Sequence, residues 1–140
     1  MKILVRAVGK MRDRRLEAVC AEYVERTRRH LPIEVHEVET DGDLLRNLPA
    51  GSEIVALEPG GECWTTAEFM DYVAKRMVQG TRAIVFLIGG AEGLQRSTVA
   101  RAQRRLSLSP LTLPHRLARV LLCEQIYRVI SAIRGEPYNK

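Results

Sequence analysis

Two stretches of the sequence have residue types suited to holding a small ligand against the backbone. The first is the run Gly89-Gly90-Ala91-Glu92-Gly93, which directly follows a wholly apolar segment. Glycines there remove side chains that would keep a ligand away from the backbone, and they allow positive φ angles. The run lacks the G-x-G-x-x-G spacing of dinucleotide sites, and no Lys-Ser or Lys-Thr follows it as a phosphate loop requires. It therefore predicts either a site for a nucleotide-like ligand or a plain strand-to-helix turn.

The second stretch is Ser109-Pro110-Leu111-Thr112-Leu113-Pro114. Its two prolines fix φ and lack N–H donors, whereas Leu111, Thr112 and Leu113 between them keep theirs. Such a stiff loop can hydrogen-bond the edge of an adenine while the leucines cover its faces, as in mostly apolar ligand pockets with a few fixed polar groups. The alternative is a rigid start to the last helix, with Pro114 in its first turn.

Both stretches follow predicted strands of an α/β sandwich. Apolar runs predict strands at 2–8, 53–58, 83–88 and 106–108, and a loose alternation of apolar and polar residues predicts an edge-type strand at 33–38. Helical spacing predicts helices at about 13–30, 65–78, 99–105 and 115–134, with at most a short one at 44–48. This alternation of strands and helices predicts a mainly parallel sheet with helices on both faces, in a single domain spanning residues 1–140. Ligands bind such sheets beyond the carboxyl ends of strands, which here means after Leu57, Ile88 and Leu108.

The residues between the third strand and its helix predict a sharp change of direction. Pro59-Gly60-Gly61 is expected to end the strand with a turn, and Thr65 or Thr66 to cap the helix that follows. Trp64, just before the cap, predicts a hydrophobic staple, with a stacking platform as the alternative.

Composition and cysteine spacing exclude several classes of protein. No apolar run approaches the roughly 20 residues needed to span a bilayer, and residues 1–8 are too short for the apolar region of a secretory signal. We therefore expect a cytoplasmic protein without a membrane partner. Cys20, Cys63 and Cys123 are odd in number and widely spaced, which predicts reduced structural thiols and no metal site.

The net charge of +5 conceals a strong segregation along the chain. Residues 1–30 carry nine basic and four acidic side chains, residues 31–72 carry one and ten, and residues 73–140 carry twelve and three. Basic segments of this kind are typical of polyanion binders, although they are equally compatible with a solvated surface. The arginines from Arg12 to Arg29 have the same two explanations, RNA contact or a solvated helix face.

Several stretches resemble the ribosomal large-subunit methyltransferase H family, a single-domain group of the SPOUT class. The resemblance is densest in FLIGGAEGL at 86–94, LSLSPLTLPHRLARVLLCEQIYR at 106–128 and the terminal RGEPYNK, and it extends to ILVRAVGK and EIVALEPGG earlier in the chain. It implies a C-terminal trefoil knot and a homodimer that meets across the last helix. From the residues alone, the apolar stripe of that helix suits either a dimer interface or a monomer core.

The resemblance also implies the cofactor S-adenosylmethionine and the residues that bind it. Carried over by motif, these residues are Leu57, Gly89, Leu108, Ser109, Pro110, Leu111, Thr112 and Leu113. They coincide with the three strand exits chosen from the sequence pattern. A branched side chain at Gly89 is expected to abolish cofactor binding while leaving the fold largely intact.

The implied reaction transfers a methyl group to N3 of a pseudouridine in 23S rRNA, on the assembled ribosome and without a metal. An imide N–H is a poor nucleophile until its proton leaves, so the reaction needs a proton acceptor and an in-line approach to the methyl group. His115, Tyr138 and Lys140 are the candidate catalytic groups, although His115 is also a common helix-start residue and Lys140 a chain end. The family's tail usually reads Tyr-His and a basic residue, whereas this chain has Asn139, which cannot accept a proton at neutral pH.

Arg119 and Arg128 are closest in sequence to the expected site, and we expect them to contact RNA phosphates. Two other functions stay open at this point: a catalytically idle RNA- or ribosome-binding module, and a nucleotide-binding enzyme of another type. Cofactor binding separates the three, because the idle module would not bind S-adenosylmethionine and a different nucleotide enzyme would bind competing nucleotides equally well.

Overall fold

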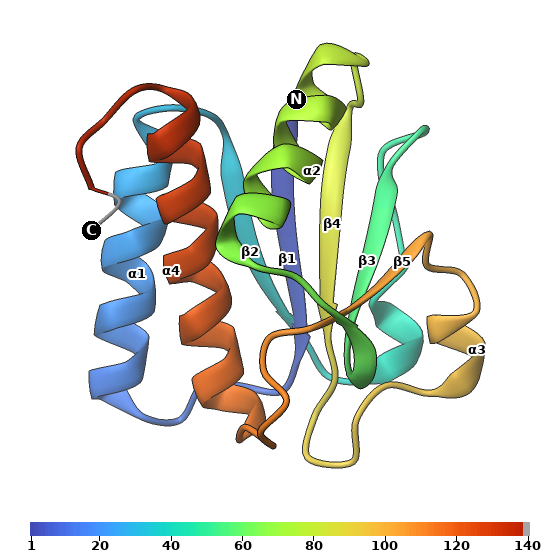
Figure 1. Ribbon diagram of the computed structural model, residues 1–140. Coiled ribbons are helices and arrows are strands. Elements are labelled where there is room, and N and C mark those ends of the chain that lie inside the picture. Colours follow the sequence, from blue (N-terminus) through green and yellow to red (C-terminus); the bar gives the residue numbers. More distant parts are fainter. Residues whose placement is uncertain (139–140) are drawn as a thin grey trace.

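A five-stranded parallel sheet forms the centre of the computed structural model, which describes residues 1–138 (Figure 1). The strands are β1 (Lys2–Val8), β2 (Ile33–Val38), β3 (Glu53–Cys63), β4 (Ala83–Ile88) and β5 (Arg104–Ser107), in the spatial order β2-β1-β4-β3-β5. Every pair of neighbours is parallel. All strands therefore present their carboxyl ends at one edge of the sheet, the lower edge in Figure 1.

Three long helices cover one face of the sheet: α1 (Arg14–Arg28), α2 (Thr66–Val78) and α4 (His115–Ile133). Alternate strand residues, such as Val5 and Phe86, form the larger core beneath them. The opposite face, with Leu4 and Leu87, is covered by the segment around the 3-10 helix η1 (Asp41–Asp43) and by the segment around the short α3 (Arg96–Val99). The predicted parallel α/β sheet is confirmed, with all long helices on one face.

Local sequence determines where α1 and α2 begin. The Asp13 side chain accepts hydrogen bonds from the first free N–H groups of α1, and Thr65 with Glu68 forms a capping box at α2. Trp64 packs on Phe69 with ring centroids 5.8 Å apart. The predicted hydrophobic staple is thereby confirmed.

Strand β3 is longer than the sequence predicts. It continues through Pro59-Gly60-Gly61 as far as Cys63. Its register against β5 shifts between Leu57 and Glu62, both of which pair with Leu106. The residues in between therefore bulge out of the ladder, and the predicted strand end was wrong because a bulge uses the same residue types as a turn.

The region between β4 and β5 also differs from the prediction. The helix expected at 99–105 is a single turn at Arg96–Val99, and β5 takes the arginines that follow. The Asp41 carboxylate accepts hydrogen bonds from the N–H of Gln95 and the hydroxyl of Thr98, which fixes α3 to the η1 segment. Both partners of this contact are far apart in sequence, so local spacing does not reveal it. Within residues 1–138, no helix has the length and apolar character needed to cross a membrane.

The β3 bulge predicts unequal tolerance of two adjacent glycines. A Cβ on Gly61 would lie 2.7 Å from the backbone carbon of Arg105, whereas a Cβ on Gly60 would meet nothing within 4 Å. We expect Gly61→Ala to lower the free energy of unfolding by about 2 kcal/mol or more, because β3 and β5 must separate. Gly60→Ala, the control, should change it by less than about 1 kcal/mol. Urea unfolding measures both, and equal stabilities would contradict the close approach of the strands.

Candidate functional site

A cleft of about 880 Å³ opens at the carboxyl ends of β3, β4 and β5. Its walls come from the residues after these strands and from the start of α4; among them are Leu57, Gly89, Leu108, Ser109, Leu111, Thr112, Leu113 and His115. The structure therefore brings together every residue expected to bind the cofactor except Pro110, which belongs to the same loop but does not line the cleft.

The loop between β5 and α4 is held by its own serines. The Ser107 hydroxyl donates to the Ser109 carbonyl oxygen at 2.8 Å, and the Ser109 hydroxyl accepts the Leu111 N–H at 2.9 Å. Within residues 1–138, the N–H groups of Thr112 and Leu113 have no hydrogen-bond acceptor. This loop thus presents two fixed donors beside apolar side chains.

Gly89 has a different role from the one expected of it. A Cβ at this position would lie 2.4 Å from the carbonyl carbon of Gly93 and 2.6 Å from the Leu94 nitrogen. Gly93 itself has a positive φ of 78°. The expectation that a branched residue at Gly89 leaves the fold intact was therefore wrong: this glycine lets the loop close upon itself, and that closure shapes the cleft wall.

The cleft also contains charged residues that sequence reasoning missed. Glu58, Glu92 and Arg96 line it. Glu58 reaches the wall because of the β3 bulge, and its carboxylate lies 3.3 Å from Arg105 Nη1. Its position directly after Leu57 was a usable signal for the site, and Glu92 belongs to the glycine run 89–93 that was already a candidate, whereas no pattern in the sequence singles out Arg96.

His115 lies at the start of α4 and lines the cleft. Burial lowers its pKa below the ordinary value of 6.5, and the nearby charges of Arg116 and Arg119 lower it further. The imidazole is therefore neutral at pH 7, a state in which one ring nitrogen can accept a proton.

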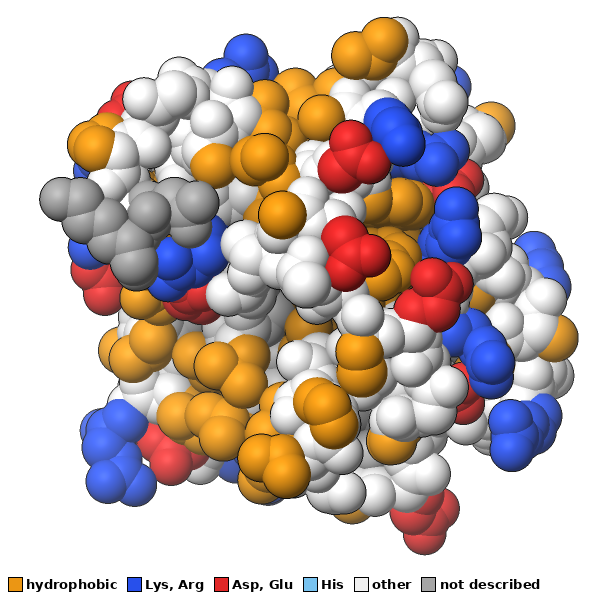
Figure 2. Space-filling model, viewed as in Figure 1, with side chains coloured by type: hydrophobic (Ala, Val, Ile, Leu, Met, Phe, Trp, Pro, Cys, Tyr) orange, Lys and Arg blue, Asp and Glu red, His pale blue; other side chains and the backbone are white. Residues whose placement is uncertain are grey.

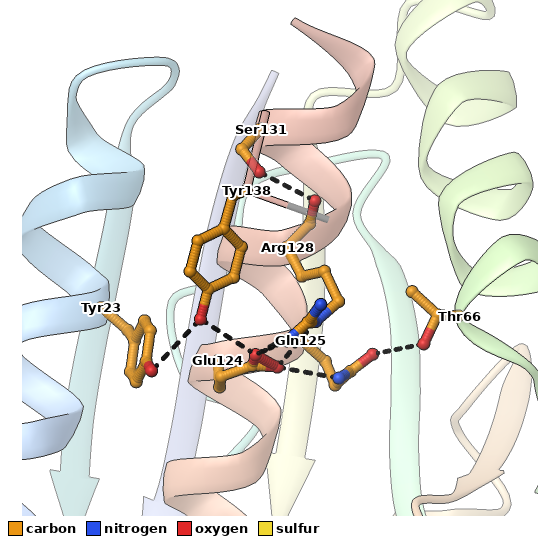
Figure 3. A network of polar contacts seen from close by, with 7 residues as sticks. All are labelled: Tyr23, Thr66, Glu124, Gln125, Arg128, Ser131 and Tyr138. Atoms are coloured by element: carbon orange, nitrogen blue, oxygen red, sulfur yellow. Dashed lines mark hydrogen bonds and ion pairs between the residues drawn. The ribbon is translucent and has the colours of Figure 1, made fainter. Parts of the chain in front are cut away.

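Tyr138 lies against α1 and α4, away from the cleft lining (Figure 3). Its hydroxyl is 3.2 Å from the Tyr23 hydroxyl and 3.4 Å from a carboxylate oxygen of Glu124. Burial, together with these two neighbours, raises the pKa of the phenol, which keeps it protonated. His115 and Tyr138 are thus not brought together within one chain, and Lys140 lies outside the described residues.

Arg128 takes part in the same network (Figure 3). Its Nε and Nη2 groups donate to both carboxylate oxygens of Glu124 at 2.9 to 3.1 Å, and its guanidinium lies over the Tyr138 ring, 4.9 Å from the centroid. Glu124 also accepts from Gln125, which in turn accepts from Thr66 of α2 at 2.9 Å. This arrangement connects the tail with all three long helices and commits Arg128 to it.

Arg119 does not have the position expected of an RNA contact. Its side chain is 2% exposed, with Nη1 donating to Glu37 at 2.6 Å and Nη2 donating to the Gly9 carbonyl at 2.9 Å. A guanidinium buried in this way cannot reach a phosphate on the surface. We therefore replace the expected RNA contact with a structural role, since spacing along a helix does not tell which arginine faces inward.

Residues 1–138 contain no group of three or more His, Cys, Asp or Glu side chains that could hold a metal ion. All three cysteines are free thiols, with Cys20 and Cys123 buried and Cys63 exposed. The chemistry available in the cleft is therefore that of hydrogen-bond donors, carboxylates and one imidazole.

Known proteins match this chain over nearly its whole length. A family model described as "Predicted SPOUT methyltransferase" matches residues 1–139. "Ribosomal RNA large subunit methyltransferase H" of Sorangium cellulosum is 41% identical, covering 99% of each chain. The proteins of the same name from Dechloromonas aromatica and Ruminiclostridium cellulolyticum are 38% and 36% identical and are covered to 99% and 100% of their lengths.

These matches extend over the whole described fold, including the three strand exits that form the cleft. The chain belongs to the SPOUT methyltransferase family.

Proposed function

We propose that the chain transfers a methyl group from S-adenosylmethionine to N3 of a pseudouridine in the 23S rRNA of the assembled ribosome. The observation that carries this proposal is the convergence of Leu57, the loop after Ile88 and the loop 108–113 on one cleft. The printed names of the relatives, which describe methyltransferases of large-subunit ribosomal RNA, support the class of substrate.

The cleft residues fit S-adenosylmethionine. A cleft of about 880 Å³ lies within the range of small-molecule sites. The free N–H groups of Thr112 and Leu113 suit the hydrogen-bond acceptors on an adenine edge, between leucine side chains that cover its faces. Glu92 supplies negative charge for a ligand that carries a sulfonium and an ammonium group, and Glu58 adds a carboxylate that it shares with Arg105.

The same charges disfavour a nucleotide-binding enzyme of another type. Phosphates in this cleft would meet the carboxylates of Glu58 and Glu92, and Arg96 is the one Lys or Arg side chain among the described residues that line it. An idle RNA-binding module is disfavoured for a different reason, since it would not need two free backbone donors beside leucine side chains in a cleft.

When bound, the cofactor supplies an electrophilic methyl group. The chain's own part is to position the target base and to receive the N3 proton. We assign proton acceptance to the neutral imidazole of His115, because it lines the cleft and its pKa is lowered. Tyr138 stays protonated, so its hydroxyl is suited to binding a base and not to accepting a proton.

We further propose a homodimer whose interface includes α4, together with the trefoil knot that the family implies. Leu111, Leu117 and Leu121 are 76%, 37% and 38% exposed, an unusual group for a solvated surface. Figure 2 shows hydrophobic side chains gathered over the lower half of α4 and the adjoining loop. In a single chain Tyr138 is docked away from the cleft, so its contact with substrate requires a movement of the tail or a second copy. A ribosomal substrate places the protein in the cytoplasm.

The direct test supplies methyl-labelled S-adenosylmethionine to ribosomes that lack the modification, and then maps the label. We expect a single labelled pseudouridine, with ribosomes that already carry the modification as the control. Labelling of free rRNA but not of assembled particles would contradict the proposed substrate. If calorimetry detects no binding of S-adenosylmethionine, the catalytically idle RNA-binding module becomes the better explanation. If ATP competes equally well for the cleft, a nucleotide-binding enzyme of another type is favoured.

Replacing His115 tests the route of the proton. We expect His115→Gln to lower the rate of methyl transfer about 100-fold or more, the usual contribution of a positioned base, with unchanged affinity for S-adenosylhomocysteine. Because the pKa of His115 is lowered from 6.5, the neutral form persists to more acidic pH, and the midpoint of the acid limb of the wild-type rate should lie below pH 6.5.

His36→Gln is the matched control, since His36 is on β2 and does not line the cleft. It should keep both the rate and the acid limb of the pH profile. If His115→Gln also keeps them, another group accepts the proton.

A further inference from the structure

The segment between β1 and α1 is held by contacts from α4, β2 and α1. Arg119 binds the Gly9 carbonyl at 2.9 Å, and Arg116 Nε donates to the Lys10 carbonyl at 3.3 Å. The Met11 N–H donates to Glu37 at 2.8 Å, and Asp13 caps α1. Two arginines of α4 thus fix the backbone of this loop from one side, while β2 and α1 fix it from the others.

The side chains displayed by this loop and by the first residue of α1 are basic. Lys10, Arg12 and Arg14 are exposed, and within residues 1–138 none of them has an acidic partner. Arg12 has a positive φ of 59°, a conformation that costs energy for a residue other than glycine and persists only where the surroundings impose it. We name Lys10, Arg12 and Arg14 the basic platform.

Many other basic side chains are already neutralised. Arg26, Arg28, Arg46, Arg104 and Arg105 each lie within ion-pair distance of a carboxylate. Arg119 and Arg128, the contacts expected from the sequence, are committed to Glu37 and Glu124. Among residues 1–138, Arg82, Arg101 and Arg134 also lack an acidic partner, so unpaired charge occurs at several places; Arg119 and Arg128, in contrast, are committed within the fold.

The basic platform lies next to the mouth of the cleft. Arg116, which binds the Lys10 carbonyl, directly follows His115 of the cleft lining. Figure 2 shows a group of Lys and Arg side chains at the lower left, over the beginning of α1. Arg96 lines the cleft at another wall.

We propose that the basic platform binds backbone phosphates of the rRNA next to the target nucleotide. This rests on the proposed function, because a base that enters the cleft brings its neighbouring phosphates to the cleft mouth. A rigid loop with unpaired Lys and Arg side chains suits such binding, since phosphate contacts fix the position and orientation of a nucleic acid without reading its sequence. Arg119 then acts as a positioning residue, because it holds the loop and does not touch RNA.

The test compares two neutralised variants of the full chain. The first combines Lys10→Ala, Arg12→Asn and Arg14→Ala, with asparagine chosen because it tolerates a positive φ. The control combines Arg29→Ala, Arg82→Ala and Arg134→Ala, which removes the same charge at exposed positions at the opposite end of the sheet. Affinity for ribosomes with an unmethylated target is measured at several salt concentrations, and binding of S-adenosylhomocysteine is measured by calorimetry.

We expect the platform variant to bind ribosomes about tenfold more weakly or worse, with the slope of log affinity against log salt reduced by about 2 to 3, one phosphate contact per removed charge. Its KM for ribosomes should rise while kcat and S-adenosylhomocysteine affinity stay unchanged, and the control should match the wild type.

Equal weakening of both variants would mean a general effect of net charge, and unchanged binding of the platform variant would mean that RNA lies elsewhere; either outcome overturns the proposal. Arg14→Ala alone, at an exposed position of α1, should reduce the slope of log affinity against log salt by about 1. This single variant tests the proposal even if the triple variant folds poorly. Wild-type chains that bind ribosomes through the platform but transfer no methyl group would disprove the proposed reaction and leave this surface intact.

Discussion

The buried guanidinium of Arg119 is the interaction on which the functional end of the molecule depends. A charge that is 2% exposed is tolerated only with partners, and here these are Glu37 at the end of β2 and the Gly9 carbonyl just after β1. The pairing fixes the first turns of α4 over the carboxyl edge of the sheet. It thereby sets the position of His115, of the loop that leads into α4 and of the segment before α1. Its contribution is to define one geometry, since a buried ion pair adds little net stability over a well-packed apolar pair.

The parallel sheet supplies the second constraint, because it gathers all strand exits at one edge. The β3 bulge modifies that edge: Leu106 pairs with both Leu57 and Glu62, so Glu58 and Pro59 leave the ladder and enter the cleft wall. Gly89 lets the neighbouring loop close on itself, and Ser109 holds the next one. Backbone conformation at the strand ends thus shapes the cleft, and it leaves the N–H groups of Thr112 and Leu113 free for a ligand.

Much of this could be predicted from the sequence where the determinants are local. The strands at Lys2–Val8 and Ala83–Ile88 follow from apolar runs, that at Ile33–Val38 follows from a loose alternation of apolar and polar residues, and the start of α2 follows from its cap and staple. The failures involve contacts between distant residues: the bulge at Pro59-Gly60-Gly61 depends on β5, and α3 depends on Asp41. Arg119 was misassigned for the same reason, because its partner Glu37 is 82 positions away. The cleft residues could be predicted because the alternation of strands and helices fixes where the strands end. The direction in which a side chain such as Arg119 points depends on packing against distant residues, which the sequence pattern does not show.

The most direct measurement of the central claim is amide hydrogen exchange, followed residue by residue in NMR spectra with and without S-adenosylhomocysteine. Thr112 and Leu113 lie in a loop outside any helix or strand, and within residues 1–138 their N–H groups have no acceptor, so they should exchange fast in the free protein. On addition of the ligand we expect both amides to become protected, together with the segments after Leu57 and Ile88 that form the other walls. Protection confined to the amino edge of the sheet, or unchanged exchange at Thr112 and Leu113 under saturating ligand, would contradict a cofactor site in this cleft.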